Sequence, residues 1–122
     1  MKLLAAALLA CSNADPATIK TIEKVSIEFS LDPTIILAIA CKESGISGVN
    51  PLGVNSCTGN NAVRAKGPDW CILLGVVSYQ NRLLVHKTEE KALAAYNNSK
   101  HRKKYAESVG WIAKKIRNNL VK

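Results

Sequence analysis

Aromatic residues are scarce in this chain of 122 residues, which has two Trp, three Tyr and one Phe. The core must therefore consist mainly of aliphatic side chains. The chain has no Cys-x-x-Cys pair, and its two His lie far in sequence from its four Cys, so no zinc site is expected. No apolar run reaches the roughly 20 residues that span a bilayer. With 48% hydrophobic and 21% charged residues, the composition excludes a disordered chain and fits one globular domain.

Acidic residues are also few, because nine Asp and Glu stand against seventeen Lys and Arg, giving a net charge of +8. The excess is concentrated in residues 100–122, where eight basic residues accompany the single acid Glu107. This charge favours a polyanionic partner, and nucleic acid, anionic lipid and the acidic polymers of a bacterial envelope all meet that description. One hypothesis is therefore a basic helical protein that binds nucleic acid or membrane.

The N-terminus has the features of a short export signal. Met1-Lys2 gives a charged start, and the apolar stretch Leu3 to Ala10 follows it. The residues Leu8 to Cys11 loosely resemble a bacterial lipoprotein cleavage box, in which Cys11 would carry the lipid. We therefore expect a signal or lipoprotein-like segment at 1–11 and a folded domain at 15–122, with a plain hydrophobic first helix as the alternative.

Four cysteines leave the disulfide pattern open, since connectivity cannot be deduced from spacing. Cys57 and Cys71 bracket a loop that contains Gly, Asn and Pro, and closing such a loop stabilises a fold by about 3 kcal/mol in the chain-entropy model. We favour that pair. Cys41 lies in an apolar helix and is expected as an unpaired, buried thiol, unless Cys11 stays in the mature chain.

Apolar residues recur at helical spacing through most of the chain, so the sequence predicts a mainly α fold. Two helices are expected to begin with an Asp-Pro pair, an N-cap followed by proline at the first helical position. A long irregular insert, residues 45–67, follows the second helix because five Gly and one Pro interrupt any period there. The five expected helices cover approximately 16–29, 33–43, 69–85, 89–96 and 102–119.

Glu43 is the most informative single residue. It follows the apolar run Ile35 to Cys41 and lies in the last turn of the second helix, about 20° in projection from Ile36. The side chain therefore points toward the buried side of the helix. Desolvation and the negative end of the helix dipole both raise the pKa of a carboxyl group, which makes Glu43 a candidate general acid. An ordinary solvent-exposed glutamate at a helix end is the alternative.

Four segments of the chain form a recognisable series. They are Glu43-Ser44-Gly45 with Asn50-Pro51, the helix from Gly75 to Leu84, the run Ala92 to Asn97, and Tyr105 to Val109. In this order they resemble the segments of the lysozyme-like lytic transglycosylases, bacterial enzymes that cleave peptidoglycan. The resemblance covers approximately residues 19–116. The family usually has a Gly-Leu-Met-Gln segment that lines the sugar groove, and this chain has none.

The resemblance implies a lysozyme-like fold and a monomeric enzyme of the periplasm or cell envelope that needs no cofactor or metal. Glu43 would protonate the glycosidic oxygen between N-acetylmuramic acid and N-acetylglucosamine and then accept a proton from the 6-hydroxyl. Tyr96 would lie close to Glu43 and hydrogen-bond it or the sugar. Ser44 and Asn97 would contact the substrate or support the acid, and Trp70 would stack on a sugar.

Each of these residues also has a structural alternative. Tyr96 could fill core volume with its hydroxyl bonded to a carbonyl, Ser44 could bond the backbone at a helix end, and Trp70 could anchor its loop. A hydrolase similar to goose-type lysozyme and a non-catalytic wall-binding module are the rival functions. Asp69 is the one plausible second carboxylate for a hydrolase. The export signal argues against nucleic acid as the partner.

Overall fold

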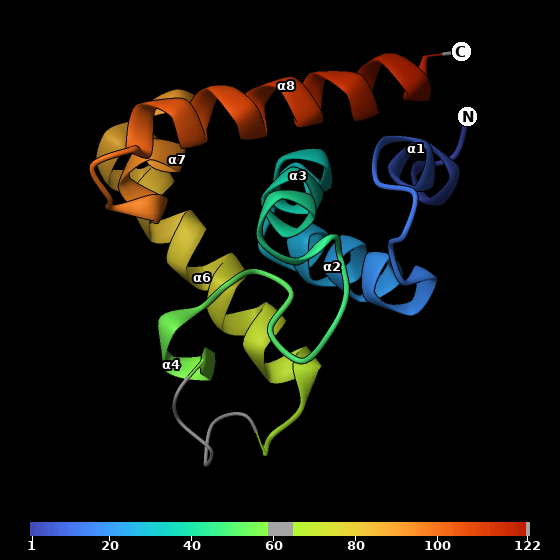
Figure 1. Ribbon diagram of the computed structural model, residues 1–122, viewed down its shortest axis with the longest axis horizontal. Coiled ribbons are helices and arrows are strands. Elements are labelled where there is room, and N and C mark those ends of the chain that lie inside the picture. Colours follow the sequence, from blue (N-terminus) through green and yellow to red (C-terminus); the bar gives the residue numbers. More distant parts are fainter. Residues whose placement is uncertain (59–64, 122) are drawn as a thin grey trace.

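The computed structural model describes residues 1–58 and 65–121, and within these residues the fold is entirely helical, with seven helices and no strand (Figure 1). The prediction of a mainly α protein is confirmed. Two helices exceed the five that were expected, one in the N-terminal segment and one in the insert. The helices are α1 (Leu3–Ala10), α2 (Pro16–Glu28), α3 (Pro33–Ser44), α4 (Asn55–Thr58), α6 (Pro68–His86), α7 (Glu89–Asn97) and α8 (Arg102–Leu120).

The helix boundaries follow the capping residues of the sequence. Asp15 accepts a hydrogen bond from the backbone N–H of Thr18 at 3.2 Å and begins α2, and Asp32 accepts one from Thr34 at 2.9 Å and begins α3. Gly45 ends α3 in the left-handed conformation, with φ +71°. The five expected helices are confirmed to within about one residue at each end.

Helix α3 forms the centre of the molecule. Each of its residues from Thr34 to Ala40 is buried, so this helix is apolar on nearly all sides. Helix α8 lies across α1, α3 and α7, while α6 packs against α2 and α7 (Figure 1). This arrangement fixes the C-terminal end of α3, which carries Glu43, beside the insert and near α6 and α7.

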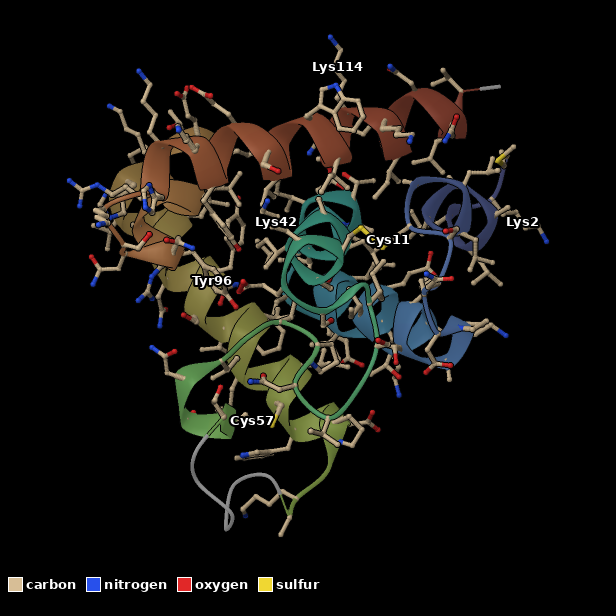
Figure 2. The ribbon with its side chains drawn as sticks, viewed as in Figure 1. Lys2, Cys11, Lys42, Cys57, Tyr96 and Lys114 are labelled. Atoms are coloured by element: carbon tan, nitrogen blue, oxygen red, sulfur yellow. A yellow bond between two sulfur atoms is a disulfide. The ribbon has the colours of Figure 1, made fainter. Side chains whose placement is uncertain are left out.

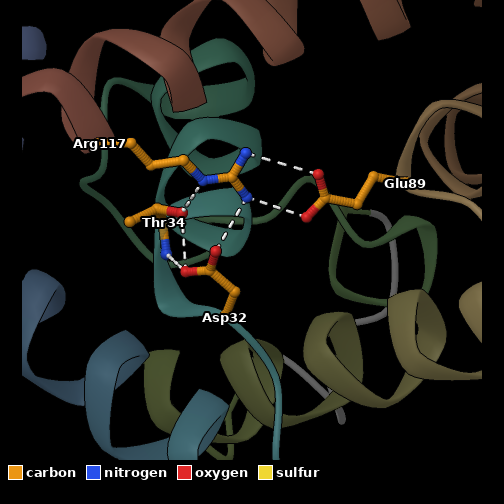
Figure 3. A network of polar contacts seen from close by, with 4 residues as sticks. All are labelled: Asp32, Thr34, Glu89 and Arg117. Atoms are coloured by element: carbon orange, nitrogen blue, oxygen red, sulfur yellow. Dashed lines mark hydrogen bonds and ion pairs between the residues drawn. The ribbon is translucent and has the colours of Figure 1, made fainter.

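A polar network connects α8 to the starts of α3 and α7 (Figure 3). The Arg117 guanidinium donates to Asp32 and to Glu89 at 2.9 Å each, and its Nε donates to the Thr34 hydroxyl at 2.9 Å. Burial alone would raise the pKa of Asp32, but hydrogen bonds from Thr34 and the charge of Arg117 outweigh it and lower that pKa. The network therefore holds together three helix ends that are far apart in sequence.

The N-terminal segment is a helix packed into the core, with Ala6 and Ala7 fully buried. A disulfide joins Cys11 to Cys41, with Cα atoms 6.1 Å apart. Cys41 is therefore paired, which is the alternative that was left open for a chain containing Cys11, and the two residues meet on one side of α3. A lipid thioether at Cys11 and this disulfide need the same sulfur, so one molecule cannot contain both. Cleavage of an export signal stays a prediction.

The second disulfide, Cys57–Cys71, is the predicted one and joins α4 to α6, with Cα atoms 6.2 Å apart. Two disulfides indicate that the chain folds in an oxidising, exported environment. Within the described residues, no helix combines the length and apolar character needed to cross a bilayer. The described residues of the insert, 45–58 and 65–67, are irregular apart from the single turn α4, and its residues 59–64 lie outside the described part of the chain.

Candidate active site

A pocket of about 390 Å³ opens where the end of α3 meets the insert, α6 and α7. Its volume lies within the range of about 300–1,000 Å³ that is typical of small-molecule sites. Polar side chains and backbone dominate its wall. The described residues that line it are Glu43, Gly53, Val54, Asn55, Ser56, Ser78, Arg82, Tyr96 and Asn97.

Glu43 is the single carboxylic acid among these lining residues. Burial raises the pKa of its carboxyl group, and the neighbouring charge of Lys42 opposes that rise only in part. The side chain nevertheless remains exposed, because the pocket into which it projects is open to solvent. Glu43 was expected to face the buried side of its helix. The residue is instead exposed, and its carboxyl group lies against Gly53 in the pocket wall. A protonated acid at an accessible pocket can donate its proton to a bound molecule.

Gly53 forms the pocket wall directly against the Glu43 carboxyl group. A Cβ atom placed on Gly53 would overlap the Glu43 carboxylate oxygen and lie 2.8 Å from its carbon. Gly53 also has a φ of +65°, which L-residues with a side chain rarely adopt. Its conformation therefore favours glycine at this position, and any added side chain would displace the Glu43 carboxyl group.

The turn that carries Gly53 is held by side chains on either side of it. The Asn50 side chain accepts from the Val54 N–H and donates to the Val54 carbonyl, both at 2.9 Å. The Ser44 hydroxyl lies 2.8 Å from the Pro51 carbonyl oxygen and so connects the end of α3 to the same turn. The sequence motif that contains Glu43, Ser44, Asn50 and Pro51 thus builds the backbone around the acid.

Tyr96 projects from α7 toward the interior of the molecule and lines the same pocket as Glu43 (Figure 2). Its hydroxyl donates to the carbonyl oxygen of Leu52 at 2.6 Å, and therefore not to Glu43, since a phenol has one proton. Burial raises the pKa of Tyr96, and the nearby charge of Glu43 adds to the rise. The two residues that were predicted to lie close together do share one site, but the backbone of Leu52 is the partner of the phenol.

The remaining predicted site residues divide into two groups. Asn97, the last residue of α7, lines the pocket, and its side-chain oxygen accepts a hydrogen bond from the Ser99 hydroxyl. Ser44 is not a lining residue and bonds backbone, as its structural alternative proposed. Trp70 is 39% exposed in the first turn of α6, with Lys66 Nζ 5.0 Å from its ring centre, and it too is absent from the pocket wall.

Six lining residues escaped sequence analysis. Four belong to the insert and two, Ser78 and Arg82, come from α6; the four are Gly53, Val54, Asn55 and Ser56. The Arg82 Nη1 donates to the Ser78 hydroxyl at 2.9 Å, and its Nε donates to the Ala95 carbonyl at 3.2 Å. The sequence did contain one sign of a functional role for Arg82, because it is the only Lys or Arg in the otherwise largely apolar stretch from Pro68 to His86. Gly53 carried no such signal, since it is one of five glycines in the insert.

Comparison of this chain with family models, with curated proteins and with solved structures gives no match. The chemistry of the pocket is therefore what supports an assignment of function. Within the described residues no group of His, Cys, Asp and Glu is arranged to hold a metal ion.

Proposed function

We propose that the protein is a peptidoglycan lytic transglycosylase of the cell envelope or periplasm, with a lysozyme-like domain and Glu43 as its acid and base. The observation that carries the proposal is the solitary carboxyl group in the pocket, with its pKa raised by burial. Cleavage of a glycosidic bond usually needs two carboxyl groups, an acid and a nucleophile or base. A transglycosylase needs only one, because a hydroxyl group of the substrate is the nucleophile.

In the proposed reaction the protonated Glu43 donates its proton to the oxygen that links N-acetylmuramic acid to N-acetylglucosamine. The C1–O bond breaks, and its electron pair remains on the departing oxygen. The 6-hydroxyl of the same muramic acid then attacks C1 and loses its proton to the Glu43 carboxylate. The product has a 1,6-anhydro end, no water is consumed, and Glu43 returns to its protonated form. A carboxyl group with a raised pKa suits both steps.

We assign Tyr96 a positioning role in this reaction. Its bond to the Leu52 carbonyl fixes the backbone that leads to Gly53, and Gly53 lies against the Glu43 carboxyl group. Ser44 acts through the same turn by way of Pro51. Asn97 lines the pocket and is the candidate for a direct contact with the sugar. Trp70 does not line the pocket, so it could contact only a part of the glycan strand that extends outside it.

A hydrolase on the same scaffold is the main rival, and the position of Asp69 weighs against it. Asp69 is exposed in the first turn of α6 and does not line the pocket, so it is poorly placed to activate a water molecule opposite Glu43. A wall-binding module without turnover is the second rival, suggested by the missing Gly-Leu-Met-Gln segment.

The test is release of soluble fragments from purified peptidoglycan sacs by the wild-type protein, by Glu43→Gln and by Glu107→Gln. Glu107 is an exposed acid of α8, so its variant is the matched control. The proposal predicts release by wild type and Glu107→Gln and none by a folded Glu43→Gln. Release by Glu43→Gln would refute it, and sedimentation of the wild type with the sacs without release would favour a binding module.

We further propose that the outward face of α8 attaches the enzyme to an anionic polymer of the envelope. Trp111 is 65% exposed on this face, and the ammonium group of Lys115 lies 5.4 Å from the centre of its ring. Lys114 points away from the body of the protein beside it (Figure 2). A Lys114→Glu, Lys115→Glu variant should lose salt-sensitive binding to purified acidic wall polymer. Equal binding by that variant, or stronger binding of the wild type to anionic vesicles or DNA, would contradict this partner.

A further inference from the structure

Arg82 brings a positive charge to the wall of the pocket that contains Glu43. Two of the three nitrogens of its guanidinium group bind the protein, because Nε donates to the Ala95 carbonyl and Nη1 donates to the carbonyl and hydroxyl oxygens of Ser78. The remaining nitrogen, Nη2, makes no hydrogen bond to any described residue. Arg82 is therefore a fixed cation with two N–H groups left over.

No carboxylate of the described protein neutralises this charge. Both ion pairs in the described part of the chain belong to Arg117, which lies on α8. Glu43 is the single acid of the pocket, and its pKa is raised, whereas a guanidinium group paired with it would lower that pKa. Arg82 and Glu43 thus share a pocket without forming a pair, and the cation is available to a bound anion.

We propose that Arg82 binds a carboxylate group of the glycan substrate and so orients the strand over Glu43. A guanidinium group already held through Nε and Nη1 loses little freedom when its Nη2 binds an anion, and charge-assisted hydrogen bonds are the stronger kind. This inference rests on the proposed function, because peptidoglycan supplies the anion. Two sources share the chemistry: the lactyl carboxylate of a muramic acid that lacks its peptide, and the free carboxylates of the peptide stem.

The competing role for Arg82 is purely structural, since its bonds to Ser78 and Ala95 join α6 to the end of α7. A structural role predicts that loss of Arg82 impairs every substrate alike. A binding role predicts that the loss depends on whether the substrate carries a charge. The charge of the substrate is therefore the variable that separates the two roles.

The experiment uses three preparations of the same glycan strands: strands with peptide stems, strands whose stems have been removed so that the lactyl carboxylate is free, and these stripped strands after amidation of the carboxylate. KM and kcat are measured for wild type, Arg82→Gln and Arg82→Lys. For at least one carboxylate-bearing preparation, Arg82→Gln should raise KM about tenfold or more, with a smaller rise in Arg82→Lys. On amidated strands the three proteins should differ by less than about threefold.

The preparation that shows the larger rise in KM identifies the source of the carboxylate. An equal loss by Arg82→Gln on all three preparations would overturn the inference and leave the transglycosylase proposal intact. A second experiment needs no turnover. Calorimetry measures the binding of the same strands to the single variant Glu43→Gln and to the double variant Glu43→Gln, Arg82→Gln. A preference for charged strands that disappears with Arg82 would uphold the inference even if the wild type released no product, and no such preference would end it.

Discussion

The hydroxyl group of Tyr96 donates a 2.6 Å hydrogen bond to the carbonyl oxygen of Leu52, the residue before the glycine that contacts Glu43. The bond joins α7 to the insert across 44 positions of the sequence. Leu52 is itself fixed by packing, because a Cβ atom on Gly75 of α6 would lie 2.7 Å from the Leu52 Cβ. The wall beside the candidate acid is thus held by two separate elements.

Tyr96→Phe should lower both stability and activity, because it removes the bond to Leu52 and retains the ring. We expect a loss of about 1 kcal/mol in the free energy of unfolding, measured by urea denaturation. Release of fragments should fall about tenfold or more as the wall at Gly53 loosens.

Tyr79→Phe is the control for that variant, since the buried Tyr79 hydroxyl has no hydrogen-bond partner in the described part of the protein. Its removal should leave activity unchanged and stability equal or higher. If both variants lost the same activity, the bond from Tyr96 to Leu52 would have no special role.

Gly53→Ala should impair catalysis more than folding. The new methyl group would displace the Glu43 carboxyl group, and the positive φ would add a strain of about 1 kcal/mol. Gly48→Ala is the matched control, because Gly48 also has a positive φ, +82°, while nothing lies within 4 Å of the added atom. The two variants should unfold at similar urea concentrations, and only Gly53→Ala should lose most of its activity. Comparable activity in the two would contradict the placement of Glu43.

The pH dependence follows from the raised pKa of Glu43. Folding favours the protonated form, so the stability associated with this group is complete below its ordinary pKa of 4.5 and is lost as the pH rises through the raised value. Activity that requires the protonated acid should decline over the same range. Glu43→Gln removes this titration, so the difference in unfolding free energy between Glu43→Gln and wild type should grow as the pH rises above 4.5. A constant difference from pH 4 to pH 8 would contradict the assignment.

Helices α2, α3 and α7 could be predicted from sequence because each has a local capping residue. Asp15 and Asp32 cap their helices, Gly45 ends α3, and Thr88 begins α7 by accepting from the Lys91 N–H. The disulfide between Cys57 and Cys71 could also be anticipated, because a short segment whose sequence contains Gly, Asn and Pro separates the two residues. Packing of the α1 helix against the core could not, because an apolar stretch of eight residues fits an export signal and a buried helix equally well.

The composition of the pocket could be predicted only in part. Glu43, Tyr96 and Asn97 were expected there and do line it, whereas Ser44 and Trp70 do not. Ser44 follows Glu43 on the helix, so its side chain lies about 100° away and reaches Pro51 instead. Gly53 and Arg82 belong to the pocket through tertiary packing. No local pattern marks Gly53 for such a contact, and Arg82 was marked only as the single Lys or Arg of a largely apolar stretch.

Arg117→Gln should destabilise the fold at neutral pH by about 0.5–1 kcal/mol, since the ion pairs of Arg117 are partly exposed. The folded state lowers the pKa of Asp32, so its contribution is present above the ordinary value of 3.8 and is lost as the pH falls through the lowered value. The destabilisation, measured by urea denaturation, should therefore shrink near pH 3. Arg102→Gln, in the first turn of the same helix and outside any ion pair of the described residues, should have little effect at either pH.

The two disulfides should differ in their effect on activity. Cys57 follows the pocket residue Ser56, so the double variant Cys57→Ser, Cys71→Ser should loosen the pocket and lose activity along with about 3 kcal/mol of stability. The corresponding variant of Cys11 and Cys41 should lose a similar or slightly larger stability, because it opens a longer loop, yet keep its activity while folded. The activities of the two double variants are compared by fragment release at 10 °C. Greater loss of activity in the Cys11, Cys41 variant than in the Cys57, Cys71 variant would contradict the proposed site.

The most direct measurement of the central claim is the mass of the fragments that the wild-type protein releases from purified peptidoglycan. If Glu43 acts alone and the 6-hydroxyl of the sugar is the nucleophile, each new muramic acid end should be lighter by one water molecule than the hydrolysis product. Ends that carry the full mass of the hydrolysed sugar would contradict the account, because they require an activated water that the single carboxyl group of this pocket was inferred not to supply.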